Sequence, residues 1–281
     1  MNKKYFTPKK IHAYLRAAIQ LVFFLFLPSA FTTAFSGIKS VLTQIGAGNP
    51  IAWSSFLTVL LALCAYTIVF GRFFCGYACA FGTLGDAVHS LYLFLCKKCK
   101  KKPLLLKKSW KKPLSYVKYA VLLAVVLLCF LGVYGDLTGW SPWDVFSMLR
   151  SGNFKVGAYW LGCILLVLIL VGMVFCERFF CRFLCPMGAV FSLLPILPFF
   201  SVRRKREKCA KGCTACEKVC PSDLSLPEDG SWNVSGDCFQ CQKCLEICPK
   251  KNAKSSIRNF RGNEIWFTVL RAVVLAAVLI L

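Results

Sequence analysis

Long apolar runs separated by basic segments dominate the pattern of hydrophobic and polar positions along the chain. A helix that crosses a bilayer needs roughly 20 apolar residues. Four runs meet this requirement: Ile11–Phe35, Ile51–Phe70, Leu114–Tyr134 and Val156–Phe175. Pro28 lies inside the first run and predicts a kink there. A fifth run, Ile265–Leu281, is interrupted by Arg271 and fits either a fifth crossing or a helix on the membrane surface. The pattern predicts an all-α membrane bundle of four or five helices.

Positive charge is distributed unevenly among the segments that join these runs. Lysine and arginine cluster before the first run, between the second and third, and after the fourth. The two other loops, 36–50 and 135–155, hold only Lys39, Arg150 and Lys155. Because cytoplasmic loops retain basic residues, the N-terminus, the middle loop and everything after residue 176 are predicted to face the cytoplasm. The formal net charge of +23 is thus mostly a topology signal, and nothing else in the sequence favours nucleic-acid binding.

Two further apolar runs, Phe73–Leu95 and Phe179–Phe200, are predicted to be re-entrant or interfacial at the cytoplasmic face. If either crossed the membrane, the basic segment that follows it would lie outside, against the charge rule. The second run also contains Pro186, Pro195 and Pro198, which would break a helix repeatedly.

An eleven-residue motif occurs twice in the chain. Arg72-Phe-Phe-Cys-Gly-Tyr-Ala-Cys-Ala-Phe-Gly82 recurs as Arg178-Phe-Phe-Cys-Arg-Phe-Leu-Cys-Pro-Met-Gly188. Two predicted crossings separate the copies, so both face the same side and the repeat is parallel. We therefore expect a first membrane repeat over residues 1–95, a basic loop over 96–113 and a second repeat over 114–200.

Each copy of the motif carries a Cys-x₃-Cys pair, and the four thiols are Cys75, Cys79, Cys181 and Cys185. Within a helix, residues four apart share one face. A parallel repeat would bring the two pairs together, where they could ligate one additional iron–sulfur or other metal centre at the membrane face. Arg72 and Arg178 would offset the thiolate charge, and the adjacent phenylalanines would exclude water. A thiol–disulfide relay, a copper site and simple packing are the alternatives.

The strongest chemical signal lies in residues 201–262. Two cysteine runs, each ending in a Cys-Pro pair, are separated by a connection of 17 residues. The thiols are Cys209, Cys213, Cys216 and Cys220 in the first run and Cys238, Cys241, Cys244 and Cys248 in the second. Thiolates at this spacing surround iron–sulfur cubanes, and the last cysteine of each run ligates the other cluster.

This crossover predicts two 4Fe–4S clusters in a small cytoplasmic α+β domain of bacterial ferredoxin type. Cys220 would complete the cluster of the second run, and Cys248 that of the first. The gap between Cys209 and Cys213 is three residues where the usual gap is two, so Cys209 departs from the usual spacing. A four-cysteine zinc site would explain the thiols but not the Cys-Pro endings. Disulfides are disfavoured on the reducing side of the membrane.

Together, the ferredoxin run, Phe74-Cys-Gly-Tyr-Ala-Cys79 and Phe180-Cys-Arg-Phe-Leu-Cys-Pro186 make the chain resemble the membrane-bound polyferredoxins of the NapH and NosR type. The likeness extends from residue 11 to about residue 250, with one departure, because Ala80 stands where the family has proline. The resemblance implies a multi-pass protein of a bacterial or archaeal cytoplasmic membrane. It also implies an electron-transfer component, rather than a stand-alone enzyme, that links quinone to a flavoprotein, cytochrome or reductase.

Two other classes of function remain open at this point. The membrane cysteines suit copper, so a metal-handling or reductase-assembly protein is the main alternative. A scaffold or sensor with structural clusters is the other. The two histidines, His12 and His89, are interpreted as solvated interface residues, although His89 lies near Asp86 and could assist proton transfer to a quinone.

Overall fold

The computed structural model describes residues 8–136, 140–150, 152–153, 157–197, 201–255 and 264–280. Three residues that bound predicted runs, Val156, Phe200 and Leu281, lie outside the described residues, as do residues 256–262 of the predicted ferredoxin segment. The chain forms two compact units. The first comprises Met1–Pro28, Ala62–Cys79 and Phe191–Leu281, and the second comprises Ser29–Leu61 and Ala80–Val190.

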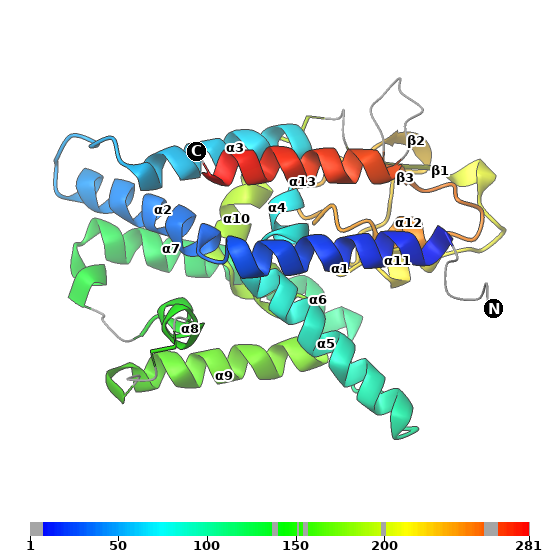
Figure 1. Cartoon of the computed structure of the whole chain (residues 1–281), viewed down its shortest axis with the longest axis horizontal. Helices are drawn as coiled ribbons and strands as arrows, with labels where there is room; N and C mark the ends of the chain where they lie inside the picture. Colours follow the sequence, from blue (N-terminus) through cyan, green and yellow to red (C-terminus); the bar gives the residue numbers. More distant parts are fainter. Residues whose placement is uncertain are drawn as a thin grey trace. The chain divides into compact units, whose positions relative to one another are not determined.

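The first unit combines helices from both ends of the chain with a small α+β segment. Its helices are α1 (Pro8–Phe26), the end of α3 (Ser55–Phe70), α4 (Phe73–Tyr77), α11 (Ala215–Lys218), α12 (Lys243–Ile247) and α13 (Glu264–Ile280), with a 3₁₀ turn η4 (Arg206–Lys208). Its strands β1 (Val202–Lys205), β2 (Asp229–Trp232) and β3 (Lys254–Ser255) form an antiparallel sheet in the order β2-β1-β3. α1 packs against α12 and α13 (Figure 1).

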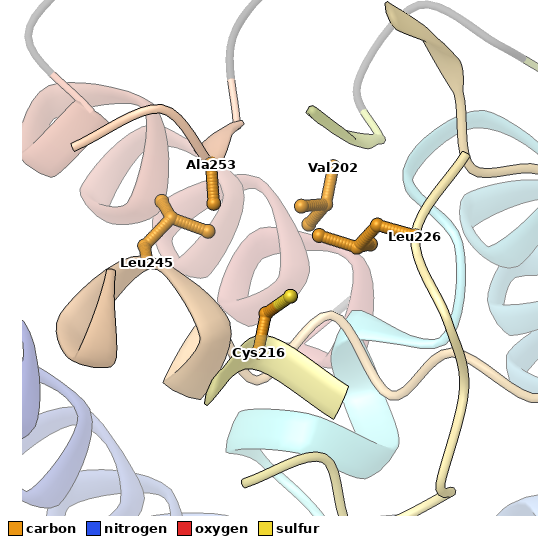
Figure 2. Packing of buried hydrophobic residues seen from close by; sticks show 5 residues of the cluster. All are labelled: Val202, Cys216, Leu226, Leu245 and Ala253. Carbon is orange, nitrogen blue, oxygen red and sulfur yellow. The ribbon is translucent and has the colours of Figure 1, made fainter. Parts of the chain in front are cut away.

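A small apolar core holds the α+β segment together. Figure 2 shows its side chains pointing toward a common centre from β1, α11, α12 and the loops between them; they are Val202, Cys216, Leu226, Leu245 and Ala253. Cys244 and Cys248 pack against this core. Three of the eight ferredoxin cysteines are therefore part of this core or packed against it. The predicted ferredoxin-type segment is present, with three short strands and two short helices.

The second unit is helical. Its helices are α2 (Ala30–Gly46), the start of α3, α5 (Ala80–Lys98), α6 (Lys108–Leu114), α7 (Val117–Phe130), α8 (Pro142–Arg150), α9 (Trp160–Phe175) and α10 (Pro186–Leu193), which ends in the first unit. It also contains 3₁₀ turns η1 (Val133–Asp136) and η2 (Gly157–Tyr159) and a π-helical turn η3 (Phe180–Leu184). α2 packs against α7, and α8 against α9 (Figure 1). Gly46 permits the first contact, because a Cβ there would lie 2.2 Å from the Phe130 carbonyl oxygen.

The apolar runs form helices, but of unequal length. By length and composition, one described helical stretch, Lys108–Phe130, can cross a membrane by itself, and Ile11–Phe26 with Ala30–Gly46 qualifies as a pair bent by 62°. The break at residues 27–29 confirms the predicted kink at Pro28. α3 and α9 are apolar but only 16 residues long. α3 begins at Ser55 rather than Ile51, since the Ser54 hydroxyl accepts a hydrogen bond from the Leu57 amide. The helical class is confirmed, whereas the multi-pass bundle remains a proposal.

Both copies of the repeated motif have the same local form. The first cysteine lies in a short helical turn, α4 or η3, the second lies in the break that follows, and a new helix begins at the next residue. Cys75 and Cys79 therefore do not share the face of one continuous helix, and neither do Cys181 and Cys185. In the second copy the reason is Pro186, which cannot continue the preceding turn and instead starts α10.

Candidate metal centre

The structure gathers Cys220 with the cysteines of the second run. A single cavity is lined by the thiol residues Cys216, Cys220, Cys238, Cys241 and Cys244, together with Val202, Leu224, Leu226 and Phe239. Cys241 and Cys216 are buried, and the other three are half-buried. This is the neighbourhood that the predicted crossover requires, because Cys220 lies far from the second run in sequence but next to it in space.

Burial and crowding raise the pKa of the thiols at this cavity. Desolvation, followed by the nearby Cys220, raises the pKa of Cys238 to about 11, although a hydrogen bond from the Gln240 backbone and Arg72 oppose this shift. The pKa of Cys244 is raised well above its ordinary value by desolvation and then by Cys241, Cys238, Cys220 and Cys216. Several thiolates so close together need positive charge, and bound iron supplies it while displacing the protons. The donor set thus fits an iron–sulfur cluster.

The second set of thiols is held by polar side chains. Asn252 bridges two of them, because its side-chain amide donates to Cys209 Sγ at 3.3 Å and its backbone amide donates to Cys248 Sγ at 3.1 Å. Arg204 donates to Cys216 Sγ at 3.1 Å. Cys209, Cys213 and Cys248 are half-buried. Among the described residues, no three His, Cys, Asp or Glu side chains converge as closely as the ligands of a single metal ion.

The loop between Cys238 and Cys244 owes its shape to two buried glutamines. Gln240 and Gln242 adopt left-handed backbone conformations, with φ of 52° and 61°, which reverse the chain between successive thiols at a cost in strain. Gln240 donates to the Ser201 hydroxyl at 3.3 Å, and Gln242 bonds the Thr268 hydroxyl of α13 at 2.9 Å. The role of these glutamines could not be predicted from the sequence, because glutamine has no preference for a positive φ.

Three arginines from other parts of the first unit reach this loop. Arg16 of α1 donates to the Cys241 carbonyl oxygen at 3.0 Å and to Glu246 Oε1 at 2.7 Å. Arg72 lies 3.6 Å from the Asp237 carboxylate, with its guanidinium over the Phe239 ring. Arg271 of α13 is buried, bonds the Ser255 hydroxyl at 2.8 Å and lies close enough to Cys238 to oppose the rise in the pKa of that thiol. Of these three arginines, the sequence pointed only to Arg72, as a counter-charge for the thiols of the repeated motif, and the structure places it beside Cys238.

α4 of the first motif packs directly on the same loop. A Cβ at Gly76 would lie 2.3 Å from the Phe239 carbonyl oxygen, so only glycine allows this approach. Gln20 of α1 donates to the Gly76 carbonyl oxygen at 3.1 Å. Cys75 and Cys79, both buried, therefore belong to the same unit as the ferredoxin thiols. The second motif has Arg182 in place of this glycine.

The second thiol pair lies in the second unit, and Cys181 and Cys185 are both buried. The Cys185 sulfur accepts a hydrogen bond from the Gly188 amide at 3.2 Å, capping the start of α10. Phe180 packs against Phe31 and Phe81, with ring centroids 6.0 and 4.8 Å away, so the pair is shielded from water as expected.

Arg178 opens the second motif and forms a buried ion pair. Its guanidinium binds the Asp86 carboxylate of α5 at two points, at 2.9 Å and 2.5 Å. His89, one turn further along α5, is also buried, with Nδ1 3.0 Å from the Val174 carbonyl oxygen. The interpretation of His89 as a solvated residue was therefore wrong, since the face of α5 that carries Asp86 and His89 packs against α9.

Comparisons with known proteins agree with this chemistry. A family model described as a 4Fe–4S binding domain matches residues 52–113 and 158–206, and each of these segments contains one copy of the repeated motif. An uncharacterized protein of Methanocaldococcus jannaschii is 32% identical over 195 residues, which cover 69% of this chain and 68% of the relative. The ferredoxin-type protein NapH of Haemophilus influenzae is 26% identical over 211 residues, 71% of this chain and 67% of NapH. The chain belongs to the NapH and NosR type of polyferredoxin.

The putative electron transport protein YccM of Escherichia coli is a further similar protein, 27% identical over 219 residues, 76% of this chain and 59% of YccM. No solved structure matches the chain. Membership of the NapH and NosR type confirms the predicted family, its iron–sulfur character and its class of function, electron transport.

Proposed function

We propose that this NapH/NosR-type chain is a membrane electron-transfer subunit, which exchanges electrons between the quinone pool or a redox partner and two 4Fe–4S clusters at the cytoplasmic face. The observation that carries the proposal is the cavity lined by Cys220, Cys238, Cys241 and Cys244, on which α4 of the repeated motif packs through Gly76. The ferredoxin thiols and one copy of the membrane motif thus share one compact unit.

The first cluster would be held by Cys220, Cys238, Cys241 and Cys244, and the second by Cys209, Cys213, Cys216 and Cys248. Such a cluster supplies a one-electron redox centre whose potential depends on net charge, hydrogen bonds to sulfur and exposure. Arg16, Arg72 and Arg271 place positive charge around the first thiol set. Arg204 and Asn252 donate hydrogen bonds to sulfurs of the second.

Exposed apolar side chains support the membrane part of the proposal. Large exposed hydrophobics run along the apolar helices α7 and α9; they are Leu123, Leu127, Phe130, Trp160, Ile164, Leu165, Val167, Leu168 and Val171. So much apolar surface suits contact with lipid rather than water. The basic segments then favour a topology with the N-terminus, the 97–112 loop and the ferredoxin segment in the cytoplasm.

Fusion reporters test this topology. Reporters at Lys101 and Lys251 should both read as cytoplasmic, and one at Gly152 as external, because inverting the basic loops is unfavourable during insertion. A reporter at Lys101 that reads as external would mean that the segment containing α4 and α5 crosses the membrane.

We further propose that Cys75, Cys79, Cys181 and Cys185 bind an additional metal centre between quinone and the ferredoxin clusters. The support is that all four thiols are buried and that their two local structures repeat. Each pair lies within a segment matched by the 4Fe–4S family model. Buried thiolates at such sites require a metal or a hydrogen-bond donor to remain charged.

Quinol reduction tests both the function and this centre. Reduced quinone added to anaerobic membranes should generate the EPR signals of reduced clusters in the wild type, whereas Cys75→Ser and Cys181→Ser should each abolish that reduction and lose iron. Dithionite should still reduce the ferredoxin clusters in both variants. Unchanged iron and quinol reduction in both variants would show that the pairs only pack. Copper loading into the four thiols without any quinone effect would favour the metal-handling alternative.

A further inference from the structure

The thiol set formed by the first cysteine run and Cys248 is surrounded by lysines. Cys209, Cys213 and Cys248 are half-buried. Four exposed lysines flank them in sequence: Lys208, Lys211, Lys250 and Lys251. Glu207 is the exposed acidic residue within the same stretches, so the local charge is strongly positive.

Asn252 joins these two stretches into one surface. It donates to Cys209 Sγ, to Cys248 Sγ and, at 2.6 Å, to the Lys205 carbonyl oxygen. Residues 205–211 and 248–251 are therefore held side by side, although about forty positions separate them in the chain. Of the five lysines on these stretches, we call Lys208, Lys211, Lys250 and Lys251 the basic patch.

We infer that the basic patch is the docking surface for a small, acidic electron-carrier protein. The inference rests on the proposed function, since it places the partner next to half-buried thiols that would hold the second cluster. Complementary charge steers a carrier to such a surface and accelerates its encounter. Ile247, 45% exposed and adjacent to Cys248, adds an apolar contact at the edge of the patch.

A lipid surface fits the patch less well than a protein does. Lipid-binding basic segments interleave cations with large apolar side chains that enter the bilayer. The 97–112 segment has that pattern, because Leu104, Leu105 and Trp110 are exposed among its lysines. Apart from Ile247, the stretches that form the basic patch contribute no exposed large hydrophobic residue among those that the structure describes.

The test uses the full chain, purified anaerobically with its iron, and flavodoxin as an acidic carrier probe. The patch variant combines four substitutions: Lys208→Glu, Lys211→Glu, Lys250→Glu and Lys251→Glu. The control variant makes the same charge change in the other basic segment: Lys98→Glu, Lys101→Glu, Lys102→Glu and Lys107→Glu. We expect the association rate constant to fall about tenfold or more in the patch variant and by less than about twofold in the control. In the wild type, high salt should lower the association rate constant as the four substitutions do.

Equal rate constants in all three proteins, or equal losses in both variants, would overturn the inference. So would a patch variant that binds flavodoxin normally but no longer binds phosphatidylglycerol vesicles, because that result assigns the patch to lipid. Iron content and quinol reduction are measured on the same samples. If these remain normal while docking is unaffected by the patch, only the docking surface is wrong and the proposed function stands.

Discussion

Gly76→Arg is expected to remove the first cluster while leaving the second in place. Any side chain at this position meets the Phe239 backbone, since a Cβ would lie 2.3 Å from the carbonyl oxygen. A backbone atom cannot rotate aside, so the loop that carries Cys238 and Cys241 must move. Because the four thiols of that site act together, we expect a loss of about four irons per chain, the content of one cubane. Iron analysis and EPR of the reduced protein measure the loss.

The matched control is Gly157→Arg. A Cβ at Gly157 would meet nothing within 4 Å, and the residue is exposed. The control should retain full iron, and the signals of both clusters should persist. Full iron in Gly76→Arg would show that the packing of α4 does not position the ligand loop.

Asp86→Asn is expected to destabilise the second unit strongly. Arg178 is fully buried and binds the Asp86 carboxylate at two points. The substitution leaves the guanidinium charge in place without its counter-charge, which typically costs about 3–5 kcal/mol. In thermal unfolding, that loss corresponds to a drop in Tm of roughly 6–20 °C.

Two control variants distinguish the loss of this ion pair from the loss of any carboxylate charge. Asp229→Asn removes an exposed carboxylate at β2 and should leave the Tm close to that of the wild type. The double variant Asp86→Asn with Arg178→Gln removes both charges and should recover part of the loss. An Asp86→Asn protein with the Tm of the wild type would show that the Asp86–Arg178 pair does not contribute to stability.

Cysteine spacing and apolar periodicity were informative because they reflect local or strongly constrained geometry. The Cys-Pro runs predicted that Cys220 lies with Cys238, Cys241 and Cys244, and the structure places these four around one cavity, together with Cys216 of the other predicted set. Pro28 predicted the break between α1 and α2 because its missing amide and ring disfavour a continuing helix.

The residues that position the ligand loop (238–244) could not be predicted from the sequence in the same way. Arg16 contacts Cys241 across 225 positions of sequence, and no local pattern encodes such a pairing. Gln240 and Gln242 adopt positive φ angles that favour glycine, so propensity points away from them. The two copies of the repeat differ at the position of Gly76, where the second has Arg182, so the repeat itself indicates no requirement for glycine. The role of Gly76 depends on a backbone that belongs to a segment more than 160 residues further along the chain.

The helix lengths differ from prediction for a related reason. Hydropathy located the apolar runs, but the ends of helices depend on individual capping and breaking residues. Ser54 delays the start of α3, and Pro186 separates η3 from α10. The break after Cys75 has no such marker in the sequence, because Ala80 occupies the position of proline in the first copy of the motif.

Metal and sulfide analysis of the anaerobically purified wild type tests whether the ferredoxin cysteines bind two 4Fe–4S clusters. We expect about eight irons and eight acid-labile sulfides per chain from the two ferredoxin clusters, and more if the four membrane-motif cysteines also bind iron. Reversible EPR signals of reduced cubanes should accompany them. Stoichiometric zinc with no acid-labile sulfide would contradict the assignment of iron–sulfur clusters, because the same thiols would then form a structural zinc site.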